Sequence, residues 1–291
     1  MSISGMLFLR YRANLRALRV RAPELALYRL LFRVLTWKAY RIAKGHPVVR
    51  LHAHSRMRLS ARAGEHGIQT AIFLFREAYE TSVRTAINRF VRKGALCYDI
   101  GANLGLWSLR MAEKAGCTGQ VFAFEPFSRN VRGLVKNAAL SGLANIEVMP
   151  FALGDAESHS TLYVPEDVGR SALAPESSTD ETERVLVRRL DDVWEEQRRP
   201  TVSFVKMDVE GAEPMVLRGG QVFFGSVRPI TCCEINPGKL RNMGFDPRDV
   251  FDAFSSWRYR TFAWSHRESD LVAYQPSGNQ ECTLDLVFIP D

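Results

Sequence analysis

The feature that most constrains the fold of this chain is a glycine-containing turn between an apolar run and a helical pattern. The apolar run covers residues 95–100, and the apolar residues of segment 104–115 recur at helical spacing. The turn between them reads Asp99-Ile-Gly101-Ala-Asn103-Leu-Gly105. Glycine at two of its positions leaves room where a side chain would block a bound ligand or hinder helix packing. The turn therefore predicts a buried strand that enters a helix at a ligand-binding edge.

The rest of the chain from about residue 68 continues this alternation of strand and helix. Helices of ten to fifteen residues between short apolar strands predict an α/β fold, a Rossmann-like, doubly wound and mostly parallel sheet. The polar segment 154–184, with Gly169, Arg170 and Ser171 at its centre, is long for a loop and predicts a functional lid or partial disorder. The expected further elements are a helix over 128–140 and strands over 120–124, 146–153, 202–209, 230–235, 258–264 and 283–290.

Composition excludes several classes of protein. Of 291 residues, 46% are hydrophobic and 24% charged, which is typical of a globular chain and not of a disordered or collagenous one. No run of eighteen apolar residues occurs, which argues against a multi-span membrane protein. The five cysteines include no C-x-x-C pair, which argues against a disulfide framework and against a zinc site. A reducing, cytoplasmic compartment is the simplest interpretation.

The charge of the chain is divided unevenly. Residues 1–62 hold fourteen Lys and Arg against one acid, Glu24, which gives +13, while the remaining residues carry 25 bases and 31 acids, which gives −6. Segment 25–44 has the spacing of an amphipathic basic helix. The chain is therefore expected to consist of a basic, largely helical N-terminal extension, residues 1–67, and an α/β domain, residues 68–291.

Three interpretations of the basic extension stay open from the sequence. It could be a helical cap packed on the domain, an anchor on an anionic membrane surface, or an arm that binds nucleic acid. The acidic body and the absence of an RNA-binding signature disfavour nucleic acid as a partner. We therefore expect no nucleic-acid partner and consider an inner-membrane contact through residues 1–62, without a cleaved secretory signal.

An acid lies where nucleoside-binding sheets place one. Glu125 follows the second predicted strand, twenty residues after Gly105, and could accept both hydroxyl hydrogens of a ribose. A nicotinamide dinucleotide needs glycine where Asn103 stands, and Asp99 would face its pyrophosphate unfavourably. S-adenosylmethionine has no phosphate and carries positive sulfonium and ammonium groups. The pattern favours S-adenosylmethionine over a nicotinamide cofactor, with a turn that binds no ligand as the structural alternative.

Further short motifs follow this turn in order along residues 70–290. Together with the turn, they read Tyr98-Asp-Ile-Gly-Ala-Asn-Leu-Gly-Leu-Trp-Ser108, Phe124-Glu-Pro126, Asn137, Ala152-Leu-Gly-Asp155, Arg189-Leu-Asp-Asp192, Phe204-Val-Lys-Met-Asp-Val-Glu-Gly-Ala-Glu213, Leu217-Arg-Gly219 and Glu234-Ile235. In this order they resemble the FkbM family of S-adenosylmethionine-dependent methyltransferases, most specifically through Lys-x-Asp-x-Glu-Gly-x-Glu.

The resemblance implies a seven-stranded sheet with the cofactor across the carboxyl ends of its first strands. It implies transfer of a methyl group to a hydroxyl, on a sugar, a glycan or glycolipid, or a natural product, and it does not identify the acceptor. Ala152 would border the adenine and Glu125 the ribose. The complete set expected to bind S-adenosylmethionine is Asp99, Gly101, Ala102, Asn103, Gly105, Glu125, Pro126, Ala152 and Asp208.

Charged residues gather around the end of the fourth domain strand. Asp208 is the candidate catalytic residue, a general base for the acceptor hydroxyl or a contact to substrate or cofactor. Lys206 shares its strand face and could form an ion pair with it. Glu213 is expected to be structural, as an acid in the first turn of a helix. Carboxylates of Asp208, Glu210 and Glu234 could in principle bind Mg²⁺, but no spacing requires it and we predict no metal.

Two rival functions remain at this stage, a non-catalytic membrane-surface protein that retains the fold and a nicotinamide-dependent oxidoreductase. The joint presence of Asp99, Gly101, Gly105 and Glu125 argues against the first, since packing does not require all four. Oligomeric state has no signature in the sequence.

Overall fold

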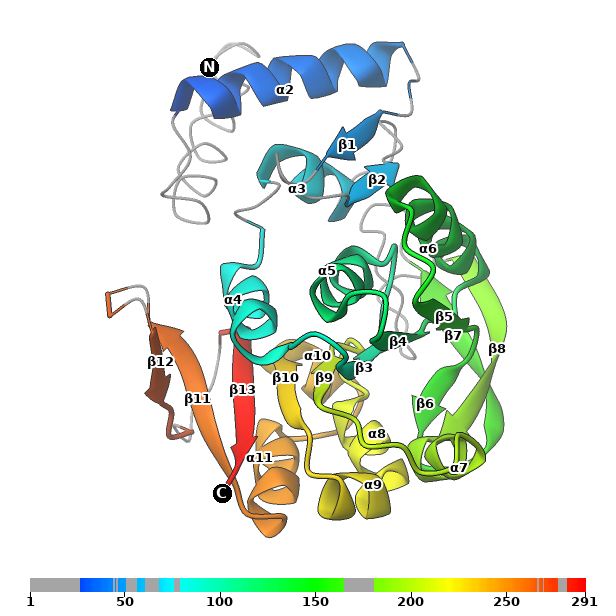
Figure 1. Ribbon diagram of the computed structural model, residues 1–291, viewed down its shortest axis with the longest axis vertical. Helices are drawn as coiled ribbons and strands as arrows, with labels where there is room; N and C mark the ends of the chain where they lie inside the picture. Colours follow the sequence, from blue (N-terminus) through cyan, green and yellow to red (C-terminus); the bar gives the residue numbers. More distant parts are fainter. Residues whose placement is uncertain are drawn as a thin grey trace.

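An eight-stranded sheet forms the centre of the computed structural model, which describes residues 27–43, 45, 47–50, 57–60, 68–75, 79–164, 181–265, 267–268, 270–276 and 282–291 (Figure 1). The strand order is β12-β11-β13-β10-β9-β3-β4-β5. The strands β10, β9, β3, β4 and β5 run parallel to one another. Each of the other three pairs antiparallel with its neighbour, β13 with β10, β11 with β13 and β12 with β11. Their bounds are β3 Leu96–Ile100, β4 Gln120–Phe124, β5 Ile146–Met149, β9 Phe204–Met207, β10 Ile230–Ile235, β11 Tyr259–Ser265, β12 Asp270–Ala273 and β13 Leu284–Pro290.

The predicted Rossmann-like, mostly parallel sheet is confirmed. Seven of its strands correspond to the seven expected, and β12 adds an eighth at the edge beside β11. The strands β4 and β10 have the predicted bounds, because each is a short apolar run buried from both sides.

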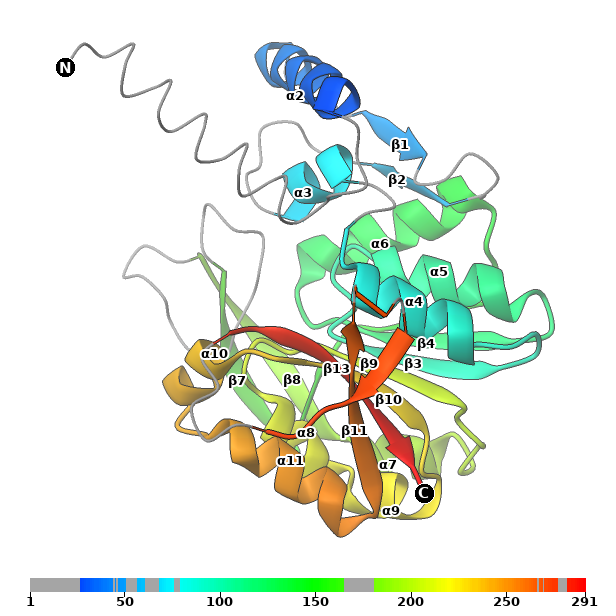
Figure 2. The same cartoon turned by 90° about the vertical axis from the view of Figure 1, so that its left-hand side faces the viewer.

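Helices cover both faces of this sheet (Figure 2). One face carries α4 (Thr81–Phe90), α5 (Leu106–Ala115) and α6 (Ser128–Ser141), which pack on it through apolar side chains such as Ile87 and Leu109. The other carries α7 (Leu190–Glu196), α8 (Glu213–Gly219), α9 (Gln221–Ser226), α10 (Pro237–Asn242) and α11 (Pro247–Ser256) over a core rich in phenylalanine. The buried cysteines Cys232 and Cys233 are part of these two cores.

A second, three-stranded sheet occupies the region expected to be a long polar loop. The strand predicted over residues 146–153 is β5, which ends at Met149. The second sheet consists of β6 (Ala152–Gly154), β7 (Ser158–Val164) and β8 (Glu181–Arg189), in the order β6-β8-β7. The expectation of a loop over all of 154–184 was wrong, because alternate apolar side chains of β7 and β8 are buried beneath polar neighbours. Gly169, Arg170 and Ser171 lie outside the described residues.

The described part of the N-terminal extension contains a helix and a hairpin, and the helix that follows them opens segment 68–291. The predicted basic helix is α2 (Leu27–Ile42), and it is followed by β1 (Val48–Arg50), β2 (Arg58–Ser60) and α3 (Ile68–Phe75). The hairpin was not predicted, since strands of three residues leave almost no periodic signal. None of the helices in the described ranges is long and apolar enough to cross a membrane.

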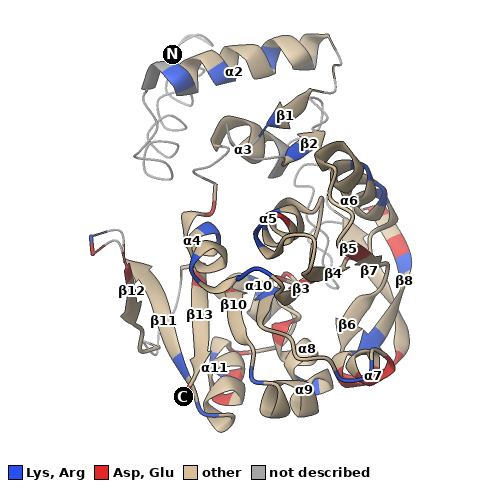
Figure 3. Cartoon of the chain, viewed as in Figure 1, with Lys and Arg blue, Asp and Glu red and all other residues tan. Residues whose placement is uncertain are grey.

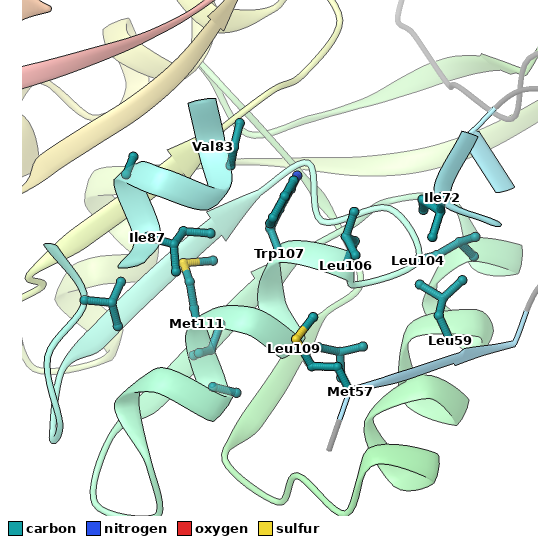
Figure 4. Close-up of a cluster of buried hydrophobic side chains, with 14 of the residues drawn as sticks. Met57, Leu59, Ile72, Val83, Ile87, Leu104, Leu106, Trp107, Leu109 and Met111 are labelled. Carbon is teal, nitrogen blue, oxygen red and sulfur yellow. The ribbon is translucent and has the colours of Figure 1, made fainter. Parts of the chain in front are cut away.

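The extension shares a hydrophobic core with the domain. Met57 and Leu59 of the extension belong to one buried cluster with Ile72 of α3 and with Leu104 and Leu109, in the glycine turn and on α5 (Figure 4). The β2 backbone is also held by α6, because the amide nitrogen of Ser60 donates to Asn137 Oδ1 at 2.8 Å and that of Arg58 donates to Ser141 Oγ at 2.9 Å. These contacts agree with the interpretation of this part of the extension as a packed cap.

The shared core predicts that a cavity in the extension destabilises the whole protein. Leu59→Ala removes a fully buried side chain and should lower the free energy of unfolding by about 2–5 kcal/mol in denaturant titration. The control is Val135→Ala on α6, where the side chain is 52% exposed. Equal unfolding midpoints for the two variants would show that the extension does not contribute to the common core.

Candidate functional site

A cavity lies at the carboxyl ends of the central strands, where the strand order changes direction. The chain passes from β3 to α5 on one face of the sheet, and from β9 to α8 on the other face. Ligands of open α/β sheets bind in the crevice that such diverging connections leave. Seven of the residues predicted for the site line this cavity, and they are Gly101, Ala102, Asn103, Glu125, Pro126, Ala152 and Asp208.

The packing of the protein backbone requires a glycine at position 101, the first glycine of the turn. Gly101 has φ +79°, and a Cβ placed on it would lie 1.8 Å from the carbonyl oxygen of Asp208. The amide nitrogen of Asp208 donates to the carbonyl of Ile100 at 3.0 Å, so the ends of β3 and β9 are held against each other. The glycine therefore brings the turn beside Asp208 through backbone contact.

Of the residues expected to bind the cofactor, Gly105 and Asp99 do not line this cavity. A Cβ on Gly105 would lie 2.7 Å from Leu134 Cγ, so this glycine serves the packing of α5 against α6. Asp99 is fully buried and accepts a hydrogen bond from the Ser108 hydroxyl of α5, because strand alternation directs its side chain toward that helix. Burial raises the pKa of Asp99, while Lys206 and Ser108 oppose this shift.

Glu125 ties the glycine turn to the next connection. Its carboxylate accepts hydrogen bonds from the amide nitrogens of Asn103 at 2.7 Å and Phe127 at 2.9 Å, and from the Asn130 side chain at 3.4 Å. Burial raises the pKa of Glu125 to about 7, although these donors favour the charged form. A buried carboxylate that faces the cavity at the end of the second domain strand suits a pair of ribose hydroxyls.

Lys206 is the cation at the centre of the site. Its ammonium donates to the carbonyl of Gly101 at 3.2 Å and to Asp208 Oδ2 at 3.3 Å, and it lies 3.9 Å from Asp99 Oδ1. Burial alone would lower the pKa of Lys206, but the carboxylates of Asp208, Asp99 and Glu80 raise it, so the lysine is charged. The ion pair predicted between Lys206 and Asp208 is confirmed.

Carboxylates surround the end of the cavity next to Asp208. Glu80, Glu210 and Glu234 line it together with Asp208. Burial and the neighbouring acids raise the pKa of Glu234 to about 11, and burial with Asp208 raises the pKa of Glu80. Glu80 Oε2 accepts a hydrogen bond from the Trp107 indole at 2.8 Å. At neutral pH the acidic end therefore carries less negative charge than its number of carboxyl groups suggests.

Sequence reasoning did not place Glu80 in the site. It lies about twenty residues before the glycine turn. Its backbone φ of 43° gives no sequence signal, since that region of conformational space is rarely occupied by a glutamate. Asn103 and Glu210 in the same cavity also have positive φ, of 51° and 54°, and such strained residues cluster at functional sites.

Two further features concern the acids after β9 and at the end of β10. Carboxylate oxygens of Asp208, Glu210 and Glu234 lie within 4.8 Å of one another, an arrangement that oxygen-preferring cations can use. Lys206 and Lys239 already lie 3.3 and 3.8 Å from the first two. Glu213 accepts hydrogen bonds from the amides of residues 209 and 211, at 3.0 and 3.4 Å, so it is structural, as predicted.

Comparison with known proteins agrees with this geometry. Residues 99–261 match the family model described as the methyltransferase FkbM domain. The chain is 31% identical over 180 residues to the 31-O-demethyl-FK506 methyltransferase FkbM of Streptomyces tacrolimicus, covering 51% of this chain and 68% of that protein. It is 30% identical over 142 residues to Methyltransferase 1 of Beauveria bassiana, covering 42% of this chain and 56% of that protein.

A solved structure is also similar to this chain. It is the methyltransferase FkbM of Methylobacillus flagellatus, with a TM-score of 0.44 and 17% identity over 76% of this chain and 53% of that one. The chain thus spans little more than half the length of this protein and of the Beauveria relative.

The family model covers more than half of the chain, so the chain belongs to the FkbM methyltransferase family.

The contact of Gly101 with Asp208 predicts a large effect of one methyl group. Gly101→Ala should lower the free energy of unfolding by about 2–5 kcal/mol, because left-handed backbone strain adds to overpacking against a carbonyl. The matched control is Gly142→Ala, since Gly142 has φ +62° but no atom within 4 Å of an added Cβ. The control should cost only about 1–2 kcal/mol, and equal losses in urea titration would contradict the close contact.

Proposed function

We propose that this methyltransferase transfers the methyl group of S-adenosylmethionine to a hydroxyl oxygen of a sugar, a glycan or glycolipid, or a natural product. The observation that carries the proposal is the placement of Glu125 and Asp208 in one cavity, on either side of the Gly101–Asn103 turn. The name of the Streptomyces tacrolimicus relative, an enzyme for an O-demethylated compound, supports oxygen as the methylated atom.

The residues at the glycine turn fit the cofactor. Asn103, with its left-handed backbone, and Ala102 line the cavity beside the Glu125 carboxylate, which can accept ribose hydroxyl hydrogens. Pro126 and Ala152 extend this wall toward the place proposed for the adenine. When bound, the donor supplies a positively charged sulfonium whose methyl group is electrophilic. The carboxylates of the acidic end are attractive to that charge.

Asp208 is the proposed general base. Its side chain is 26% exposed, and its Oδ2 is held by Lys206 at 3.3 Å, which fixes the direction of the carboxylate at the cavity wall. A carboxylate in this position can take the proton of an acceptor hydroxyl as the oxygen attacks the methyl group. Holding the two reactants in line is worth more, about 7–11 kcal/mol of the barrier in well-aligned systems, so we expect Asp208 to assist and not to be indispensable.

We also propose the division into an extension, residues 1–67, and a methyltransferase domain, residues 68–291, in a protein of the reducing cytoplasm. The basic segment 1–62 would hold it against the anionic inner surface of a membrane. The charge of +13 in this segment and the burial of three thiols in the two cores support this placement.

Glu125→Gln tests the cofactor site. The variant keeps the shape and one acceptor but loses the negative charge, so the affinity for S-adenosylhomocysteine at pH 8.5 should fall about 10–100-fold. In the wild type the affinity should weaken as pH falls through about 7, because Glu125 takes up a proton there. The variant should show no such pH dependence in calorimetric titration.

The matched control is Glu147→Gln, a change at an exposed acid of β5. It should leave the affinity and its pH profile as in the wild type. A Glu125→Gln variant that binds S-adenosylhomocysteine like the wild type at pH 8.5 would remove Glu125 from the site.

Asp208→Asn tests the acceptor side. With an acceptor found by screening hydroxyl compounds against labelled methyl donor, kcat should fall about 10²-fold or more, while the dissociation constant of S-adenosylhomocysteine changes less than about threefold. Asp252→Asn, at an exposed acid of α11, is the control and should retain kcat. Unchanged kcat in Asp208→Asn would show that Asp208 is not the base.

A further inference from the structure

Helix α2 presents one face to the protein. Trp37 is only 4% exposed, its indole donates to Thr70 Oγ1 at 3.1 Å, and its ring lies 4.6 Å from that of Phe73 on α3. The Arg33 guanidinium donates to the carbonyl of Leu74 at 2.8 Å. These contacts fix the rotation of α2 about its axis, and they therefore determine which side chains point away from the protein.

The opposite face of α2 is an exposed apolar stripe. Phe32 is 70% exposed, Leu35 64% and Ile42 86%, and Ala39 between them is exposed as well. Their spacing of three, four and three residues places all four on one side of the helix. Single exposed apolar residues are common on proteins, but a continuous stripe of this kind marks an interaction surface.

The charge around the stripe indicates the kind of partner. Arg29 and Lys38 are exposed on α2, and the helix contains no acidic residue (Figure 3). The segment 1–62 carries +13. An apolar stripe beside basic side chains is the composition of helices that lie in the interface of anionic membranes. A second copy of the chain, pairing α2 with α2, would bring two positively charged surfaces together.

We propose that α2 lies along the surface of an anionic bilayer, with Phe32, Leu35, Ala39 and Ile42 inserted into the headgroup region. This rests on the proposed membrane contact of residues 1–62 and assigns it to one helix face. A helix of sixteen residues is about 24 Å long, enough for several turns to lie flat on lipid. Figure 1 shows α2 at the outer edge of the molecule, with α3 and the hairpin between it and the domain.

Helix α3 lies between the helix proposed to contact the membrane and the cavity. Ile72 of α3 lines the cavity, and α3 is the helix on which α2 packs.

Vesicle co-sedimentation of the full chain tests the proposal. Vesicles of phosphatidylglycerol and phosphatidylcholine in equal parts should bind the wild type at low salt, and phosphatidylcholine vesicles should bind it much less. Phe32→Gln combined with Ile42→Gln should reduce the partition coefficient about tenfold or more, because two large apolar side chains no longer enter the interface. The matched control is Val135→Gln with Val222→Gln, at valines 52% and 53% exposed on α6 and α9, and it should bind like the wild type.

Three results would overturn the proposal. The first is that the wild type does not bind anionic vesicles. The second is that the variant with Phe32 and Ile42 changed binds them as well as the wild type, which would assign the binding to another part of the chain. Alternatively, light scattering would show a dimer that the α2 variant dissociates, which would identify a second copy as the occupant. Titration of the same samples with S-adenosylhomocysteine separates a failure of this proposal from a failure of the methyltransferase site.

Discussion

The close approach of two backbones, at the ends of β3 and β9, is the constraint on which the site depends. Gly101 and the carbonyl of Asp208 approach so closely that no side chain fits between them. From this contact the chain diverges to α5 on one face and to α8 on the other, and the cavity opens between the two connections. Because β3 and β9 are neighbouring parallel strands, the glycine turn and the acidic end lie side by side at one edge of the sheet.

Charged side chains also connect the glycine turn with the acidic end of the cavity. Lys206 is buried among carboxylates and binds the carbonyl of Gly101 as well as Asp208, so one cation links the turn to the proposed base. Buried charges are costly, and burial together with the neighbouring acids raises the pKa of Glu234 to about 11. The site therefore combines a carboxylate paired with Lys206 and a protonated Glu234, in a cavity lined largely by apolar side chains.

The order of strands and helices along the chain and most of the site residues were predictable, because they depend on local sequence patterns. Buried strands have apolar runs, and residues after parallel strands meet at one edge, so Gly101, Glu125 and Asp208 could be expected together. Asp99 was misplaced, since only the strand's pleat decides whether a side chain faces α5 or the cavity. The β6-β8-β7 sheet was not predicted, because the polar residues on its outer face gave the segment the composition of a loop. Glu80 depends on long-range packing against Trp107, which no local pattern reveals.

The central claim is that the cavity beside the Gly101–Asn103 turn binds S-adenosylmethionine through these residues. Its most direct test is calorimetric titration of the full chain with S-adenosylhomocysteine, with NADH as the matched ligand that Asn103, in place of a glycine, should exclude. The account predicts binding in the micromolar range for S-adenosylhomocysteine and none for NADH. Binding of NADH, or of neither ligand, would contradict it.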